Sequence, residues 1–139
     1  MTSTGNLLIV FEDHIIRQES VRYGIELAHR MKCMIFLLML LSDKFSMDKE
    51  KQNQIDLMVH SIQESGIMAS AKIRCGDKAS ELVKFLAESP AFTMVIWGSE
   101  KWFSSGKIPK LTQHWLAKVI DTIECPIVTP TLKHQFREA

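Results

Sequence analysis

The chain alternates between short apolar runs and segments with helical spacing of apolar residues. The uninterrupted apolar runs at residues 7–11 and 34–41 predict strands buried on both faces, as in a parallel sheet covered by helices. Shorter runs at 94–97 and 127–128 predict two more strands. Residues 67–73 instead alternate between apolar and polar, which is typical of a half-exposed strand at a sheet edge.

Four segments between or after these runs repeat apolar residues at positions i, i+3, i+4 and i+7. They begin at Val21, Ile55, Ala79 and Leu116, and each predicts an amphipathic helix. Asp77 is placed to cap the third of them. Strands alternating with single helices predict an α/β fold with a single open parallel five-stranded sheet and four helices distributed over both faces. The whole chain, residues 1–139, reads as one domain.

Composition excludes several classes of protein. With 46% hydrophobic and 24% charged residues, the chain has an ordinary globular balance. A net charge of +1 without a basic tract argues against a nucleic-acid partner. The longest apolar run is far shorter than the roughly 20 residues of a membrane-spanning helix. The N-terminus lacks a basic secretory signal, so a cytoplasmic protein without a membrane partner is expected.

The three cysteines, at positions 33, 75 and 125, are far apart in sequence and odd in number. They form no CxxC pair and no Cys/His cluster, so neither a disulfide framework nor a zinc site is predicted. Buried free thiols are the expected state.

Three segments resemble motifs of the universal stress protein family. Residues 7–12 (LLIVFE) are similar to the family's first strand, I-L-V-A-V-D, with Glu12 at the aspartate position. Residues 94–99 (MVIWGS) resemble L-I-V-M-G-S, and residues 125–128 (CPIV) resemble C-P-V-L. The resemblance runs through almost the entire chain.

This resemblance implies a flavodoxin-like sheet of order 3-2-1-4-5, no established catalytic chemistry, and a homodimer joined through the fifth strand. In such open sheets, ligands bind where the strand order reverses, here between strands one and four. Glu12 and Asp13 follow the first strand, and Gly98 and Ser99 follow the fourth. The resemblance also places Leu40 where a small apolar residue lines an adenine pocket.

Departures from the family's ATP motif define the functional hypothesis. ATP-binding members carry G-x-x-G, nine residues, and then G-S or G-T. Gly98 is kept here, but Lys101 stands at the second glycine, and Gln113 and His114 fall at the closing pair. Side chains at Lys101 and Gln113 crowd the backbone approach that phosphates need. We therefore expect a non-enzymatic interaction module with an eroded nucleotide crevice and no bound cofactor.

The alternative is a genuine ATP- or AMP-binding protein. Ser104, Ser105, Gly106 and Lys107 can form an anion nest that replaces the lost glycines, or they form a solvated loop. A flavodoxin-type redox protein is a third option, but the hydroxyl-rich first loop expected for a flavin phosphate is not present after Phe11.

The candidate cofactor-binding residues come from the strand ends and from the loop and helix start after the fourth strand. They are Phe11, Glu12, Asp13, Leu40, Gly98, Ser99, Lys101, Ser105, Gly106, Lys107, Gln113 and His114.

Each candidate also has an ordinary structural interpretation. Glu12 and Asp13 either bind ribose hydroxyls or an adenine amine, or serve as cap or solvated acids. As neighbours on an extended strand they are expected to point to opposite sides, which argues against an acid/base pair. His114 is either a phosphate donor or a surface residue. No catalytic residue and no metal ligand is predicted.

The dimer contact is expected along the final strand, which begins at Ile127 and ends at Thr131. Pro126 opens this strand, and a proline is tolerated best at a sheet edge. An edge strand with unpaired amides is a template for self-pairing, so this strand predicts a homodimer.

Overall fold

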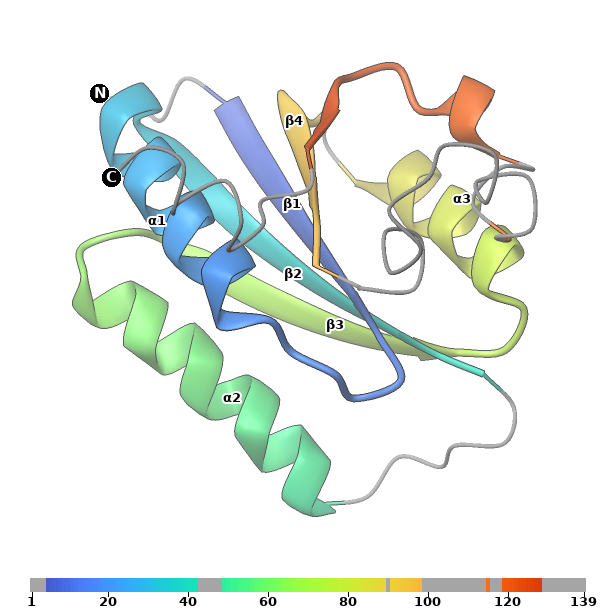
Figure 1. Ribbon diagram of the computed structural model, residues 1–139, viewed down its shortest axis with the longest axis horizontal. Helices are drawn as coiled ribbons and strands as arrows, with labels where there is room; N and C mark the ends of the chain where they lie inside the picture. The colour runs from blue at the N-terminus through green and yellow to red at the C-terminus, as the bar shows by residue number, and fades with distance from the viewer. Residues whose placement is uncertain (1–4, 43–48, 90, 99–114, 116–118, 129–139) are drawn as a thin grey trace.

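The computed structural model describes residues 5–42, 49–89, 91–98, 115 and 119–128. The elements follow in the order β1 (Gly5–Glu12), α1 (Gln18–Met31), β2 (Cys33–Leu41), α2 (Lys49–Glu64), β3 (Ala69–Cys75), α3 (Lys78–Glu88), β4 (Met94–Trp97), the 3₁₀ helix η3 (Ile120–Thr122) and β5 (Ile127–Val128) (Figure 1).

The five strands form one sheet in the order β3-β2-β1-β4-β5, and every neighbouring pair is parallel. The predicted sheet and strand order are therefore confirmed. β1 lies at the centre, where Leu7 pairs with Ile35 of β2 on one side and with Met94 of β4 on the other. The strand order reverses between β1 and β4, which places the expected ligand crevice at their carboxyl ends.

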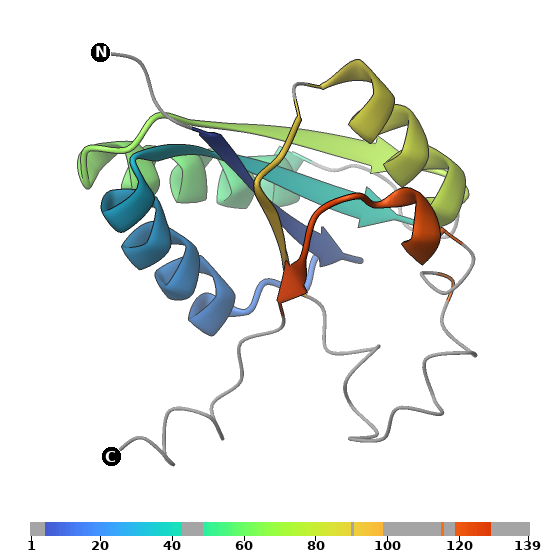
Figure 2. The ribbon, with the colours of Figure 1, turned by 90° about the horizontal axis from the view of Figure 1, so that it is seen from above.

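Alternate residues of the central strands point into two separate apolar cores. Leu7, Ile9 and Phe11 of β1 point into the core beneath α1 and α2. Leu8 and Val10 point into the core beneath α3, which the segment after residue 119 also covers. Figure 2 shows α1 and α2 on one face of the sheet and α3 on the other. All these side chains are fully buried, as their uniformly apolar sequence predicted.

The prediction of four helices is wrong for the part of the chain that the structure describes, which holds three α-helices. The fourth stripe of apolar residues was expected to begin at Leu116, which lies outside the described residues. Over residues 119–123 it forms the short η3 instead. Three of these five residues are valine or isoleucine, which lower helix propensity only slightly, so composition alone does not account for the shorter element.

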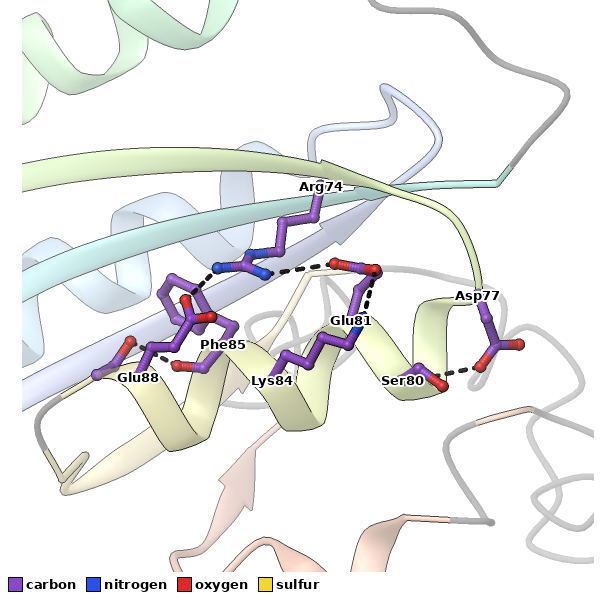
Figure 3. A network of polar contacts seen from close by, with 8 residues as sticks. Arg74, Asp77, Ser80, Glu81, Lys84, Phe85 and Glu88 are labelled. Carbon is purple, nitrogen blue, oxygen red and sulfur yellow. Dashed lines mark hydrogen bonds and ion pairs between the residues drawn. The ribbon is translucent and has the colours of Figure 1, made fainter.

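A polar network holds α3 against the edge strand β3 (Figure 3). Arg74 of β3 reaches Glu81 at 3.3 Å, also contacts Glu88, and lies over the ring of Phe85 with 5.8 Å to its centroid. At the start of α3, the Asp77 side chain accepts a hydrogen bond from the Ser80 amide at 3.0 Å, so the predicted cap is confirmed. The Asp77 cap fixes the start of the helix, and the three Arg74 contacts hold the helix against β3.

The three thiols are free, but they do not share one environment. Cys33 is buried and Cys125 is half-buried, and burial raises the pKa of both thiols. Cys75, at the end of β3, is exposed, so the expectation of a buried thiol is wrong there. Cys75 is the last residue of the edge strand β3, none of whose residues is fully buried.

The described residues include no helix that is both long enough and apolar enough to cross a membrane.

Candidate functional site

Gly98 joins the ends of β1 and β4 at the point where the strand order reverses. Its amide donates to the Val10 carbonyl at 2.7 Å, which extends the β1–β4 ladder by one bond. A Cβ at this position would lie 2.6 Å from two carbons of the Phe11 ring and 2.9 Å from the Val10 oxygen. Close packing therefore requires a glycine here independently of any ligand.

A tight turn follows β1 and redirects its acidic residues. Asp13 and His14 have φ values of 51° and 66°, and the Ile15 amide donates back to the Glu12 carbonyl at 3.0 Å. Asp and His are among the residues that most readily adopt this left-handed region. The expectation that Glu12 and Asp13 point to opposite sides of an extended strand is wrong, because the chain leaves the extended conformation at Asp13.

Both carboxylates converge on Lys78, the first residue of α3. The Lys78 Nζ donates to Glu12 Oε1 at 2.9 Å and to Asp13 Oδ2 at 2.7 Å. The side chains of Glu12, Asp13 and Lys78 are only 1%, 6% and 10% exposed, so the ion pairs are shielded from water. The second oxygen of Asp13 accepts from the Ser42 amide at 3.2 Å. This group is an internal ion cluster rather than a solvated acidic rim.

The cluster keeps Lys78 charged. Burial of the ammonium acts to lower the pKa of Lys78, but hydrogen bonds to Asp13 and Glu12 and the negative charges of both outweigh it, so the pKa is raised above its usual value. A lysine in this state is a fixed cation that orients two carboxylates. It does not have the lowered pKa of a lysine nucleophile.

The indole of Trp115 also contacts this ion cluster. Its indole Nε1 donates to Glu12 Oε1 at 2.8 Å, so this one oxygen accepts from both Trp115 and Lys78. The Trp115 ring lies 5.6 Å from the ring of Trp97 with an interplanar angle of 55°. Trp97 is the last residue of β4 and is fully buried. An aromatic plane and a buried carboxylate therefore flank the Trp115 indole.

Five of the twelve candidate residues lie in the described part of the chain. Phe11 is fully buried against Gly98. Leu40 is also fully buried, pairs with Glu12 in the β1–β2 register, and accepts at its carbonyl from the Asp13 amide at 2.9 Å. The structure thus brings Phe11, Glu12, Asp13, Leu40 and Gly98 together at one end of the sheet. The other candidates, Ser99, Lys101, Ser105, Gly106, Lys107, Gln113 and His114, lie outside the described residues.

Sequence reasoning identified neither Lys78 nor Trp115 as a member of this cluster. One signal for Lys78 was present, because a basic residue in the first turn opposes the positive end of the helix dipole and so needs a specific acidic partner. The partner is 66 residues away from Lys78 in sequence. No local pattern identifies it.

A hollow of about 570 Å³ lies at the C-terminal end of α3, away from Lys78. Its lining includes Leu86, Phe92, Ile123 and Cys125. None of the five described candidates lines it. Within the described ranges, no group of His, Cys, Asp and Glu side chains is placed to hold a metal ion.

No family model matches the chain, and no curated protein matches it in sequence. Solved structures of universal stress proteins share its fold. The universal stress protein UspA from Lactobacillus plantarum is 10% identical with a TM-score of 0.68, over 94% of this chain and 100% of that one. A universal stress protein from Archaeoglobus fulgidus is 15% identical with a TM-score of 0.61, over 91% and 93% of the two chains.

A family member from Arabidopsis thaliana, solved with AMP bound, is 13% identical with a TM-score of 0.58, over 93% of each chain. At these identities the likeness establishes the universal stress protein fold. It confirms the architecture that the sequence motifs predicted.

Proposed function

We propose that this protein is a non-enzymatic, homodimeric interaction module of the universal stress protein type, with an eroded nucleotide-binding crevice. One observation carries the proposal: Glu12, the acid at the end of β1, is fully buried and already accepts hydrogen bonds from Lys78 and Trp115. In this module Glu12 stabilises the fold instead of contacting a ligand.

The energetics support this assignment. Glu12 is fully buried, so a ribose hydroxyl or a base amine would reach its carboxylate only after the groups that cover it, including the donors bonded to it, had moved. Leaving a buried polar group unsatisfied costs about 1–3 kcal/mol, and more for a charged one. Weak nucleotide binding follows from this penalty together with the lysine and glutamine at the family's glycine positions.

The proposal includes a cytoplasmic location and action as a homodimer. The free thiols support a reducing compartment. The position of β5 at the sheet edge supports self-pairing, since an edge strand offers unpaired backbone groups.

A genuine nucleotide binder is the second candidate, and the AMP-bound Arabidopsis structure of the same fold favours it. In that case the loop that holds Ser104, Ser105, Gly106 and Lys107 would contact the phosphates of ATP or AMP.

Calorimetric titration of the purified chain with AMP and with ATP separates the two candidates. We expect dissociation constants weaker than about 1 mM, equivalent to less than about 4 kcal/mol of binding free energy, and no phosphate release from ATP. Stoichiometric micromolar binding that Lys107→Ala abolishes would establish the nucleotide binder instead. Lys84→Ala is the matched control, because Lys84 is exposed on α3 and its loss leaves the crevice unchanged.

A further inference from the structure

We infer that the hollow at the C-terminal end of α3 binds a small organic ammonium, that is, a compact apolar body that carries one protonated amine. The hollow lies away from the ion cluster at the end of β1, and no residue of that cluster lines it. The inference therefore goes beyond the proposed function and is tested independently of nucleotide binding.

The hollow has the size and the walls of a small-molecule site. Its volume of about 570 Å³ lies within the range of roughly 300–1,000 Å³ that is usual for ligand pockets. It lies between α3 and the segment that contains η3, both of which are labelled or coloured in Figure 1. Of the ten described residues that line it, six have apolar side chains, namely Val83, Leu86, Ala87, Ala91, Phe92 and Ile123.

The aromatic wall of the hollow is held in place by two other rings. The ring of Phe92 packs edge-on against Phe36 of β2, with 5.4 Å between the centroids and 81° between the planes. It also lies 6.1 Å from the ring of Phe85, at an angle of 14°, and Phe85 is buried in the core beneath α3. A wall that is already fixed loses little freedom on binding, so apolar contact with it contributes to affinity.

The charge at the hollow is negative. Glu124 lines it, and none of the described lining residues is lysine, arginine or histidine. Cys125 also lines it and stays a neutral thiol at neutral pH, because burial and, after it, the nearby charge of Glu124 raise the pKa of Cys125. The Glu124 carboxylate therefore sets the charge of the described lining, and it attracts a cation.

The C-terminal end of α3 adds to this attraction. The last carbonyls of a helix lack partners within the helix and carry a partial negative charge. The last turn of α3 contains no basic residue that would offset this charge. Ala87 and Ser89 line the hollow, so the negative end of the helix lies beside it. The helix end and Glu124 both favour an ammonium and both disfavour a carboxylate.

The two kinds of lining define the ligand by its chemistry. Glu124 is exposed, so an amine that pairs with it keeps its contact with water. Leu86, Phe92 and Ile123 are half-buried and receive the apolar body of the same molecule. An ion without a hydrocarbon body leaves the apolar lining uncovered, and an acid is repelled. The site therefore selects an amphipathic amine.

Titration with three compounds of similar shape tests the inference. Phenylbutylamine, phenylbutanol and phenylbutyrate are positive, neutral and negative at neutral pH. We expect the amine to bind about tenfold more tightly than the alcohol, and the acid to bind more weakly than both. The preference should diminish at high salt, because the ion pair is exposed. Equal affinity for the amine and the alcohol, or a preference for the acid, would overturn the inference.

Glu124→Gln removes the charge and keeps the shape of the side chain. We expect this variant to bind the amine no more tightly than the alcohol. Asp121→Asn is the matched control, because Asp121 is an exposed acid of η3 that is not among the lining residues. It should keep the preference of the wild-type chain. An equal loss of preference in the two variants would indicate a general charge effect and would overturn the inference.

Ala87→Trp fills the hollow from an exposed position on α3, where a larger side chain does not disturb the core. All three compounds should lose their binding to this variant. Undiminished amine binding by folded Ala87→Trp would overturn the inference. A wild-type chain that binds no amine, and whose dimer dissociates on this substitution, would also overturn it, because a second copy would then occupy the hollow.

Alkylation of the thiols locates the bound amine. Cys125 lines the hollow, whereas Cys75 is exposed at the end of β3 and away from it. At about 90% saturation with phenylbutylamine, iodoacetamide should modify Cys125 about tenfold more slowly, since only the free fraction reacts. The rate at Cys75 should be unchanged, as followed by mass spectrometry of the peptides. Amine binding that leaves the rate at Cys125 unchanged, or slows both thiols equally, would overturn the inference.

Discussion

At the scale of single residues, the ion cluster places two carboxylates against one ammonium in a nearly dry site. Glu12 and Asp13 each lie within 3 Å of the Lys78 nitrogen. Removing one member of such a group is far more damaging than replacing the whole group, because the charges left behind are buried without compensation. Both carboxylates depend directly on the Lys78 ammonium.

Lys78→Met should therefore lower the free energy of unfolding by about 3–5 kcal/mol at neutral pH. The raised pKa sets the pH dependence: the stabilisation by Lys78 is complete below its unfolded-state pKa of 10.5 and is lost as the pH rises through the higher folded-state pKa. The difference between wild type and variant should narrow above pH 10.5, as measured by urea unfolding from pH 7 to 11.5.

Lys84→Met serves as the control for this measurement. Its side chain is 62% exposed and lies 3.6 Å from Glu81, so its loss should change stability by less than about 1 kcal/mol. A gap between wild type and Lys78→Met that stays constant across the alkaline range would contradict the role assigned to the Lys78 charge.

The same residues show where sequence reasoning succeeds and where it fails. Asp77 was recognised as a cap because its partner lies three residues away. The pairing of Glu12 and Asp13 with Lys78 was not, because it depends on a left-handed turn at Asp13 and on tertiary packing that brings α3 to the end of β1. Contacts between residues close in sequence were predictable, whereas contacts between residues far apart in sequence were not.

At the scale of helices and strands, the pattern of burial decided which elements could be predicted from the sequence. The central strands are covered on both faces, so their apolar runs identified them directly. The edge position of β3 also followed from its alternating pattern. The last predicted helix is not seen over residues 119–123, where the 3₁₀ helix η3 forms instead.

The packing of α3 on β3 depends on the guanidinium of Arg74. The planar guanidinium bonds to Glu81 and Glu88 and also lies over the ring of Phe85. The ammonium group of a lysine cannot make all three contacts at once. Arg74→Lys should lower the free energy of unfolding by about 1 kcal/mol, and the loss should diminish at high salt. Urea unfolding at two salt concentrations measures both effects.

The same substitution at Arg30, an exposed residue of the last turn of α1, provides the comparison. Arg30→Lys should leave stability unchanged. Equal changes in unfolding free energy at the two positions would show that the Arg74 contacts with Glu81, Glu88 and Phe85 contribute nothing specific to the packing of α3.

At the scale of the whole molecule, the sheet has two edges with different capacities for self-pairing. β3 carries the exposed residues Ser70 and Lys72, and a charged side chain discourages strand addition at an edge. The described part of β5 is Ile127–Val128, which has no charge. The predicted contact that extends to Thr131 lies partly outside the described residues.

Sedimentation velocity should show a dimer that Val128→Lys converts to a monomer, because a charge on the β5 edge opposes pairing with a second copy. Ser70→Lys places the same charge on the β3 edge and should leave the dimer intact. A monomer for the wild-type chain at high concentration would contradict the proposed homodimer, and dissociation by Ser70→Lys alone would place the contact at β3.

The glycine at the tip of β4 has a consequence for redesign. The hydrogen that stands in place of a Cβ at Gly98 faces the ring of Phe11, and a carbon there would clash with the ring. Any loop engineered after β4 must therefore keep a glycine at position 98, or replace Phe11 with a smaller side chain in the same step.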